Sequence, residues 1–289
     1  MADNCLLDAI VGPNRTCIGF GSILLIGKLY YYKTPFSQFE TMNIFKYLMS
    51  SCVSFYYFVR EKCNPPTIRE GKDIPIIINN FNRFATLLNL IEALQSRGYD
   101  NIYIIDNAST YPPLLDYYKQ CPYKVFRLKE NLGFKALWKS GLNKRLCKDF
   151  FVYTDSDVVP APYCPDNFLD YFLVQLKKHP FARKIGFSLR IDNLPDCYAY
   201  KKEVIQAEKK YYMHLKDGLY RAPIDTTFAL YRPGIGLSRS RSVEAYRTAY
   251  PYQAEHLPWY ADSSNLSEEE QYYISHCRHV TSWTSKAKQ

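Results

Sequence analysis

The sequence lacks the glycine-rich motifs that hold phosphates in two large classes of nucleotide-binding protein. No Gly-x-Gly-x-x-Gly follows the first predicted strand, which excludes the usual dinucleotide fingerprint, and no Walker loop is present. The nine cysteines include no Cys-x-x-Cys pair and no spacing typical of a zinc site or a disulfide framework. This cysteine usage favours a reducing, cytoplasmic compartment.

Long apolar runs are also missing. The best candidate, residues 44–59, contains a lysine and three serines and is shorter than the ~20 residues that span a bilayer. Asp3 and Asp8 lie where a cleavable signal would carry positive charge. We expect residues 1–70 to form a helical extension, with 18–62 either packed on the main domain or in contact with the inner face of a membrane.

Aromatic residues and positive charge, in contrast, are abundant. The chain has 27 tyrosines and 17 phenylalanines, and tyrosine suits sugar-binding clefts and membrane interfaces as well as cores. The formal net charge of +9 indicates an anionic partner, such as nucleotide phosphates or acidic lipids. No nucleic-acid-binding motif is present, so we do not expect nucleic acid to be that partner.

From residue 73 onward, short apolar runs alternate with segments of helical periodicity. The predicted strands are 74–78, 101–105, 125–128 and 151–153, and the predicted helices between them are 84–97, 112–119 and a segment that ends near 146. Each predicted strand is followed by polar residues. This order predicts an α/β fold with a doubly wound, mostly parallel sheet and helices on both faces.

Two carboxylates separated by one residue, Asp155 and Asp157, follow the fourth predicted strand. In open α/β sheets ligands bind at the carboxyl ends of the strands. Two acidic side chains there can hold a divalent cation, which in turn neutralises a diphosphate. The alternative is a surface turn, because aspartate and serine are common turn residues.

Four blocks in this order resemble the family-2-like glycosyltransferases of the A-type (nucleotide-diphospho-sugar transferase) fold. They are Ile-Pro-Ile-Ile-Ile-Asn-Asn-Phe-Asn-Arg (74–83), Ile-Ile-Asp-Asn-Ala-Ser (104–109), Glu-Asn-Leu-Gly-Phe (130–134) and Thr-Asp-Ser-Asp (154–157). The combination is specific, although no single block is. The resemblance covers residues 73 to 160.

The resemblance implies a nucleotide-sugar donor and a set of residues that bind it. Asp155 and Asp157 would meet the ribose and a Mn²⁺ or Mg²⁺ ion. The implied donor-binding residues are Asn79, Asn80, Asn82, Arg83, Asp106, Asn131, Gly133 and Asp155. Where many relatives have Thr-Tyr-Asn, this chain has Asn80-Phe81-Asn82, which leaves the base open, with a UDP-sugar favoured. Plain turn chemistry is the alternative for residues 79–82, and for Asp106 with Asn107.

The second half of the chain should bind the acceptor. Predicted elements are a helix over 167–178, a strand over 185–189 and a helix over 200–217. Inverting members of the family place a general base in the part of the chain that here contains Asp225, so we expect that role for Asp225. It could instead only bond Thr227. Asp262, Glu255 and residues 268–270 are alternative bases.

The segment Glu255-His256-Leu257-Pro258-Trp259-Tyr260 is the last candidate for the site. A-type glycosyltransferases often recruit a histidine from this region as a metal ligand, and imidazole suits manganese. His256 is the candidate, with a purely structural role as the alternative, and His276 and His279 are weaker ones. Trp259 and Tyr260 could stack on a sugar of the acceptor.

Together these features predict a metal-dependent glycosyltransferase. It would move a sugar from a nucleoside diphosphate to a hydroxyl of a saccharide or lipid-linked acceptor, with inversion, in surface polysaccharide synthesis. We expect a glycosyltransferase domain over 71–289, with its donor half at 71–160 and its acceptor half at 161–289. A sugar-nucleotide pyrophosphorylase would need a glycine-rich loop, and the loop at 79–83 has no glycine. A non-catalytic relative would have lost the metal aspartates, which are both present here.

Overall fold

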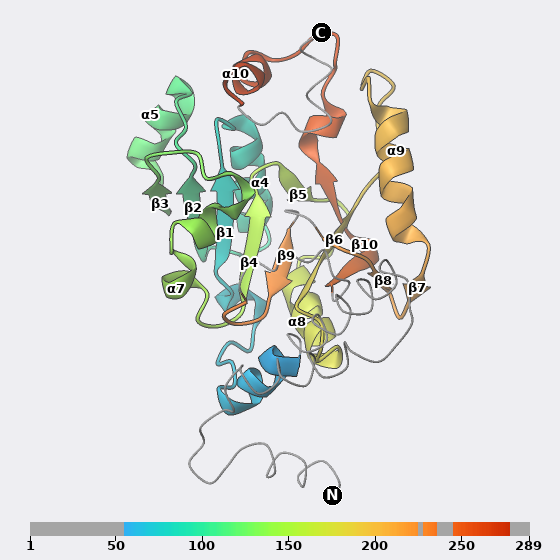
Figure 1. Ribbon diagram of the computed structural model, residues 1–289. Helices are drawn as coiled ribbons and strands as arrows, with labels where there is room; N and C mark the ends of the chain where they lie inside the picture. The colour runs from blue at the N-terminus through green and yellow to red at the C-terminus, as the bar shows by residue number, and fades with distance from the viewer. Residues whose placement is uncertain (1–54, 225–227, 236–244, 278–289) are drawn as a thin grey trace, which may run out of the picture. The chain divides into compact units, whose positions relative to one another are not determined.

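The computed structural model describes residues 55–224, 228–235 and 245–277 (Figure 1). The chain divides into two compact units, Met1–Pro66 and Thr67–Gln289. In the first unit, residues 55–63 are helical, and most of the segment 18–62 lies outside the described residues. Within the described ranges, no helix combines the length and the apolar character needed to cross a membrane. The boundary expected near residue 70 remains a prediction.

Strands and helices alternate through the first half of the second unit, as the sequence predicts. The elements are β1 (Ile76–Asn80), α4 (Ala85–Gln95), β2 (Ile102–Asp106), α5 (Pro112–Gln120), β3 (Lys124–Arg127), α6 (Ala136–Lys139), α7 (Asn143–Leu146) and β4 (Phe151–Asp155). One expected element differs. The segment after residue 134 is two short helices and not one, because Gly141 between them adopts a positive φ of 77° that interrupts the helix.

The second half is a mixture of strands and helices. The elements are β5 (Val158–Pro160), α8 (Phe168–Lys178), β6 (Lys184–Leu189), α9 (Lys201–Lys209), β7 (Leu215–Lys216), β8 (Leu219–Arg221), β9 (Ala229–Tyr231), β10 (Ala245–His256) and α10 (Glu268–His276). The helix expected over 200–217 is therefore shorter, because a hairpin turn at Asp217 and Gly218 joins β7 to β8.

All of these strands belong to one ten-stranded sheet. Its order is β3-β2-β1-β4-β9-β6-β10-β8-β7, and β5 pairs with β10. The strands β3, β2, β1 and β4 are mutually parallel, whereas β9 runs antiparallel to both β4 and β6. The predicted α/β class with a mostly parallel central sheet is confirmed, and the antiparallel strands belong to the second half.

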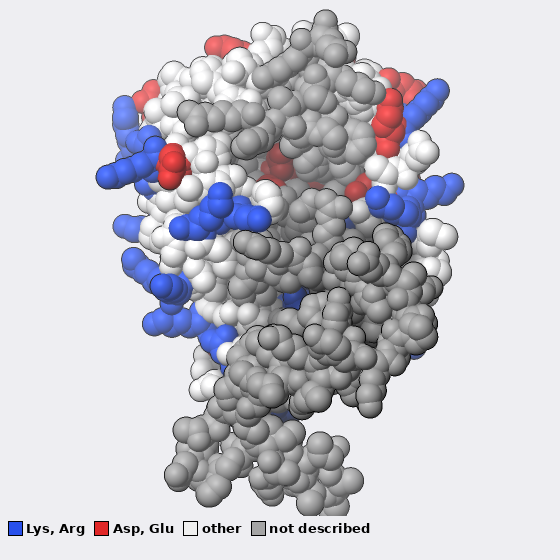
Figure 2. Space-filling model, in the orientation of Figure 1, with Lys and Arg blue, Asp and Glu red and all other residues white. Residues whose placement is uncertain are grey.

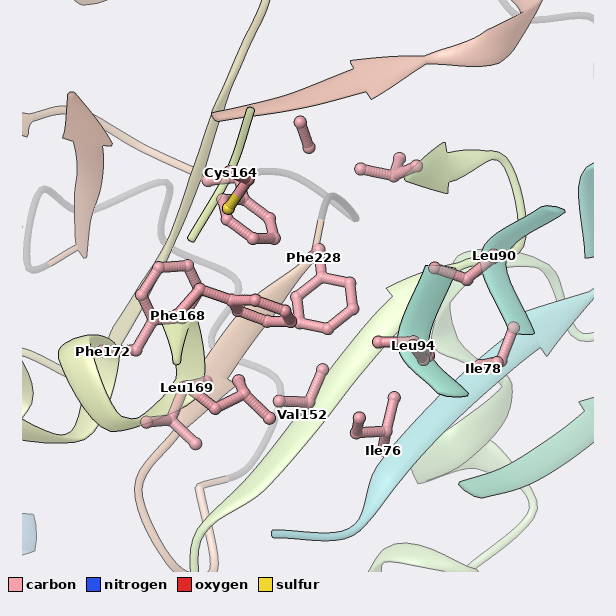
Figure 3. Close-up of a cluster of buried hydrophobic side chains, with 14 of the residues drawn as sticks. Ile76, Ile78, Leu90, Leu94, Val152, Cys164, Phe168, Leu169, Phe172 and Phe228 are labelled. Atoms are coloured by element: carbon pink, nitrogen blue, oxygen red, sulfur yellow. The ribbon is translucent and has the colours of Figure 1, made fainter. Parts of the chain in front are cut away.

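The core fills the space between one face of the sheet and helices α4 and α8. Figure 3 shows Ile76, Ile78 and Val152 from the strands beside Leu90 and Leu94 of α4, with a phenylalanine cluster around Phe168 next to them. These strand residues alternate along the chain, so Ile77 and Tyr153 face the opposite side. There Trp138 of α6 packs edge-on against Tyr153, with the ring centroids 5.0 Å apart. The sheet is thus covered on both faces.

Candidate donor and metal site

The carboxyl ends of β1 and β4 place two predicted donor residues side by side. Asn79 is in register with Asp155, and its amide nitrogen donates to the Asp155 carboxylate at 3.3 Å. Both side chains are two residues beyond Ile77 and Tyr153, so they lie on the α6 face of the sheet. Asn107 joins them through a 3.4 Å contact from its amide nitrogen to the Asn79 side-chain oxygen.

Asn107 also fixes the loop that contains Gly133. Its amide nitrogen donates to the Gly133 carbonyl at 3.0 Å, and its side-chain oxygen accepts from the Leu132 backbone at 2.7 Å. Gly133 has a φ of 68° that favours glycine. Asn131 accepts from the Gly133 backbone at 2.8 Å, so it shapes the same turn. The predicted Asn79, Asp155 and Gly133 therefore lie together, and Asn107 connects them.

The other two predicted donor residues on these strands lie on the opposite face. Asn80 is in register with Asp106, and both are fully buried. The Tyr118 hydroxyl of α5 accepts from Asn80 at 2.9 Å and contacts the Asp106 carboxylate at 3.4 Å. Asp106 also accepts from the backbone of Ser109 at 3.3 Å and pairs with Arg127 at 3.4 Å.

A hollow of about 410 Å³ lies on the outer side of Tyr118 and Arg127. It is lined by Pro112, Leu115, Asp116, Tyr118, Lys119 and Arg127. Asp106 does not line this hollow, whereas Tyr118 and Arg127, which both contact Asp106, do. The recognition of a base by Asp106 remains a prediction.

The pairing of β5 with β10 brings His256 to the aspartate motif. His256 is in register with Val158, and the Leu257 backbone donates to the Asp157 carbonyl at 2.9 Å. As a result, the Nε2 atom of His256 lies 3.7 Å from a carboxylate oxygen of Asp157. Two residues separated by about a hundred positions in the sequence thus face each other across one turn.

The environment of His256 keeps its imidazole neutral. Burial lowers the pKa of His256, the negative charge of Asp157 acts in the opposite direction, and Arg83 lowers the pKa further. The Nδ1 atom is buried and has no hydrogen-bond partner among the described residues. A neutral imidazole is the form that binds metal ions.

These groups fit a divalent cation with few protein ligands. Among the described residues, no cluster of three or more His, Cys, Asp or Glu side chains is arranged to hold a metal ion. The facing pair of Asp157 and His256 supplies one oxygen and one nitrogen donor, a combination that suits Mn²⁺. An ion there would need its remaining ligands from Asp155, a diphosphate or water. Metal binding therefore stays a prediction.

The predicted acceptor residues follow directly after β10. Trp259 is buried, its ring centroid lies 4.7 Å from that of His256, and its indole nitrogen has no partner among the described residues. The Tyr260 hydroxyl donates to Asn193 at 2.7 Å. Glu255, an alternative base, accepts from Arg190 at 3.2 Å and from Asn193 at 3.3 Å. The buried indole is placed for packing on His256, and sugar stacking remains a prediction.

Arg83 and Asn82 follow β1 and have partners within the chain. The Asn82 side-chain oxygen accepts from the backbones of Thr110 and Tyr111 at 2.7 and 3.0 Å, which ties the loop after β1 to the loop after β2. The Arg83 guanidinium pairs with Glu270 of α10 and lies 3.7 Å from the centre of the Tyr273 ring. Donor binding by either residue remains a prediction.

Some predicted residues lie outside the described part of the chain, and some observed ones were not predicted. Asp225, the expected general base, and His279 belong to the first group. His276 lies on α10, where it stacks on Tyr272. Asn107 and Tyr118 were missed as parts of the site. Asn107 had a signal, because it directly follows Asp106 at a strand end, whereas nothing in the sequence indicated that the Tyr118 hydroxyl would reach Asp106.

Comparison with known proteins gives one family match. Residues 76–177, about a third of the chain, match the family model of glycosyl transferase family 2. This segment contains β1, β2, β4 and both aspartates of the motif, whereas His256 and α10 lie beyond it. No curated protein matches the chain.

Several solved structures are similar in part. They include S. aureus TarS 1-349 in complex with UDP-GlcNAc (12% identity, 74% of this chain, 70% of that chain, TM-score 0.38) and GalNAc-T7 with UDP, GalNAc and Mn²⁺ (15%, 63%, 43%, 0.40). A cytidylyltransferase from Leptospira borgpetersenii is also similar (13%, 42%, 55%, 0.31). In another TarS structure, with UDP, the matched part spans 38% of that chain.

The segment that matches the family model contains the mutually parallel strands β1, β2, β3 and β4 of the sheet. The four blocks that resemble family-2-like glycosyltransferases lie in the parallel half of the sheet, and all but the first two residues of the first block fall inside the matched segment. Residues 76–177 therefore match glycosyl transferase family 2, and the resemblance that the sequence indicated is confirmed.

Proposed function

We propose that this protein is a metal-dependent glycosyltransferase that moves a sugar from a nucleoside-diphosphate donor, with UDP favoured, to a hydroxyl of a saccharide or lipid-linked acceptor. The observation that carries the proposal is the approach of His256 Nε2 to the Asp157 carboxylate at 3.7 Å, next to the Asn79–Asp155 pair. Both lie at the strand ends where open α/β sheets bind ligands.

The chain's own residues would hold the donor and keep water away from it. Asn79 and Asp155 offer an amide and a carboxylate to the donor, and Asn107 keeps the Gly133 loop beside them. Trp259 closes the site next to His256. Asp157 and His256 would hold a Mn²⁺ or Mg²⁺ ion, which when bound neutralises the charge that develops on a departing diphosphate.

The transfer itself needs a base for the acceptor. In the inverting reaction, a carboxylate takes the proton of the acceptor hydroxyl while that oxygen bonds to the anomeric carbon and the bond to the diphosphate breaks. Asp225 is our candidate for this base. If Asp225→Asn keeps nucleotide affinity but loses transfer, the role is supported; a product with the donor's anomeric configuration retained would exclude it.

The proposed setting is surface polysaccharide synthesis on the inner face of a membrane. Residues 18–62 supply the basic and aromatic side chains that suit a lipid interface. The resemblance of the donor half to glycosyltransferases supports the reaction, and the acceptor follows from this composition alone. No observation favours a second function over this one.

The donor and metal parts of the proposal can be tested by calorimetric titration. Wild-type protein is titrated with UDP, GDP, CDP and dTDP, with Mn²⁺ and again with chelator. We expect one nucleotide to bind in a metal-dependent way, with a loss of about a hundredfold in Asp157→Asn and about tenfold to a hundredfold in His256→Ala. Asp196→Asn is the matched control, since that carboxylate is exposed and pairs with Lys201, away from the strand ends that form the site.

The outcome separates the proposal from its rivals. Binding that is equal with Mn²⁺ and with chelator would remove the metal from the function. Binding of no nucleotide by folded wild-type protein would overturn the glycosyltransferase assignment and favour a non-catalytic relative of the fold.

A further inference from the structure

Helix α10 lies on the two loops that follow β1 and β2 (Figure 1). Glu270 forms two contacts with the guanidinium of Arg83. Glu269 accepts from the Ala85 backbone at 2.8 Å, and the Tyr272 hydroxyl contacts the Thr110 hydroxyl at 3.0 Å. Contacts from one turn of α10 thus connect this helix to the loops that are expected to bind the donor.

Glu269 and Glu270 accept hydrogen bonds from the Ala85 amide and the Arg83 guanidinium, two donors that could equally bind a phosphate. Ala85 is the first residue of α4, and the amides at a helix amino terminus bind anions. Arg83 is 5% exposed, so its charge is available only to a group that enters this position. With α10 in place, the Glu270 carboxylate neutralises it. The loop is therefore an anion site that carboxylates of the same chain now fill.

Some polar atoms in and beside this loop have no hydrogen-bond partner. Seven buried side-chain nitrogen or oxygen atoms lack a hydrogen bond in the described part of the chain. Four of them lie where β1 leads into α4: Asn80 Oδ1 at the end of β1, Asn82 Nδ2 and Arg83 Nε in the loop, and Thr86 Oγ1 in the first turn of α4. Buried polar groups are nearly always satisfied, so a concentration of open ones indicates a site made for a ligand that α10 replaces only in part.

An aromatic side chain of the helix also holds this loop. The Tyr273 ring covers the Arg83 guanidinium at 3.7 Å and packs against Phe81 with the ring centroids 6.1 Å apart. Release of α10 would therefore uncover Arg83 on the ring side as well as on the carboxylate side.

We propose that α10 is an autoinhibitory latch in which Glu269 and Glu270 stand in for the anionic group of the donor. The inference rests on the proposed function, because it takes the ligand to be a nucleoside diphosphate. Donor phosphate displaces the glutamates from Arg83 and from the amino terminus of α4, and α10 then leaves the loop. The binding-competent state is the released one, so the latch reduces the apparent affinity by the fraction of molecules that are open.

The test compares two glutamates of the same helix. Glu270→Gln keeps the size of the side chain but removes the charge that holds Arg83. Glu268→Gln removes the same charge from an exposed position, since Arg83 and Ala85 bond to Glu270 and Glu269 instead. In titrations with UDP and Mn²⁺, we expect Glu270→Gln to bind about tenfold more tightly than wild type and Glu268→Gln to bind as wild type does.

Hydrogen exchange of peptides that cover residues 268–276 provides the second measurement. We expect exchange there to increase when wild type is saturated with UDP or with inorganic pyrophosphate, and to be faster in Glu270→Gln before any ligand is added. If Glu270 instead positions Arg83 for the donor, Glu270→Gln will bind UDP more weakly and ligand will protect α10. That result, or no change in either measurement, overturns the latch.

The two proposals fail in different ways. If no nucleotide binds but pyrophosphate still releases α10, the latch stands and the proposed donor is wrong. If UDP binds to wild type and to Glu270→Gln with equal affinity and α10 stays protected, the glycosyltransferase function stands and the latch is wrong.

Discussion

The Asn107 side chain connects the end of β1 to the loop that contains Gly133. It is 1% exposed and contacts the side chain of Asn79, the carbonyl of Gly133 and the backbone amide of Leu132. Its role follows from its place directly after a buried strand, where the backbone leaves the sheet and an amide can reach two other segments. The same position in the sequence reads equally well as a simple turn.

Replacing Asn107 tests this role. Asn107→Ala leaves the Leu132 amide and the Gly133 carbonyl without their partner, so we expect the free energy of unfolding to fall by about 2–3 kcal/mol. Urea denaturation measures the change, and UDP affinity should fall in parallel because the Gly133 loop is released. Asn167→Ala, at an exposed position without a side-chain cap bond, is the control. A loss below about 0.5 kcal/mol, the range of ordinary surface changes, would contradict the assignment.

At the scale of single residues, the sequence predicts which side chains could bind a ligand or a metal ion, but not which other side chains they contact. Asp155 and Asp157 could be named because they are two carboxylates at a strand end, and His256 because the resemblance to A-type glycosyltransferases implies a histidine ligand in that region. The pairing of Arg83 with Glu270 joins positions 187 apart and depends on where α10 docks. Local pattern contains no information about that contact, so Arg83 could be read only as a donor ligand.

Among the elements, the parallel strands were the easiest to predict. Strands buried on both faces read as continuous apolar runs, and β1, β2 and β4 all have this pattern. The strand β10 was not predicted, because Pro251 lies inside it and the pairing with β6 shifts between Thr248 and Gln253, which breaks the alternation. This strand carries His256, so the second half of the site could not be placed from periodicity.

The pairing of β6 with β9 leaves no room for a side chain at Gly186. A Cβ atom there would lie 2.4 Å from the Phe228 carbonyl oxygen and 2.7 Å from the Ala229 Cβ. Both neighbours belong to the middle of the sheet and cannot move aside cheaply. This close approach, and not a special backbone conformation, explains the glycine.

Gly186→Ala should therefore destabilise the sheet. We expect a loss of about 3 kcal/mol, at the upper end of the usual cost of overpacking, measured by urea denaturation. Gly141→Ala is the comparison, because a Cβ there meets nothing within 4 Å and only the positive φ opposes it. Its cost should be about 1 kcal/mol. Equal losses in the two variants would mean that the strands separate to accept the methyl group.

On the scale of the molecule, one stretch of the chain carries most of the excess of positive over negative charge. Residues 119–148 contain nine lysines and arginines and a single acidic residue, Glu130, and so carry +8 of the formal net charge of +9. Eight of the nine basic side chains are exposed. Figure 2 shows blue side chains along the side where Figure 1 places β3 and α7. This side adjoins the donor site, because Asn107 bonds the Gly133 carbonyl.

The positive electrostatic potential of residues 119–148 should raise the association rate of an anionic donor. We expect the association rate of a fluorescent UDP analogue, followed by stopped flow, to fall steeply as salt is added. Lys139→Gln, Lys144→Gln and Lys148→Gln in one protein should slow association about threefold to tenfold at low salt and leave dissociation unchanged. Lys177→Gln, Lys202→Gln and Lys209→Gln, which lie on α8 and α9, form a control with the same net charge. Equal rates in the two triple variants would exclude steering by this side.

Arg83 and Glu270 are 187 positions apart in the sequence, so the ribosome synthesises them at different times. A ribosome that adds about 5–20 residues per second makes α10 roughly 10–40 seconds after the loop that it covers. In that interval the parallel strands of the first half can already pair, while Arg83 has no glutamate to hold. A chain that ends after residue 267 and is released from the ribosome keeps β10 and His256 but lacks α10, so it should bind a nucleoside diphosphate more tightly than the full chain.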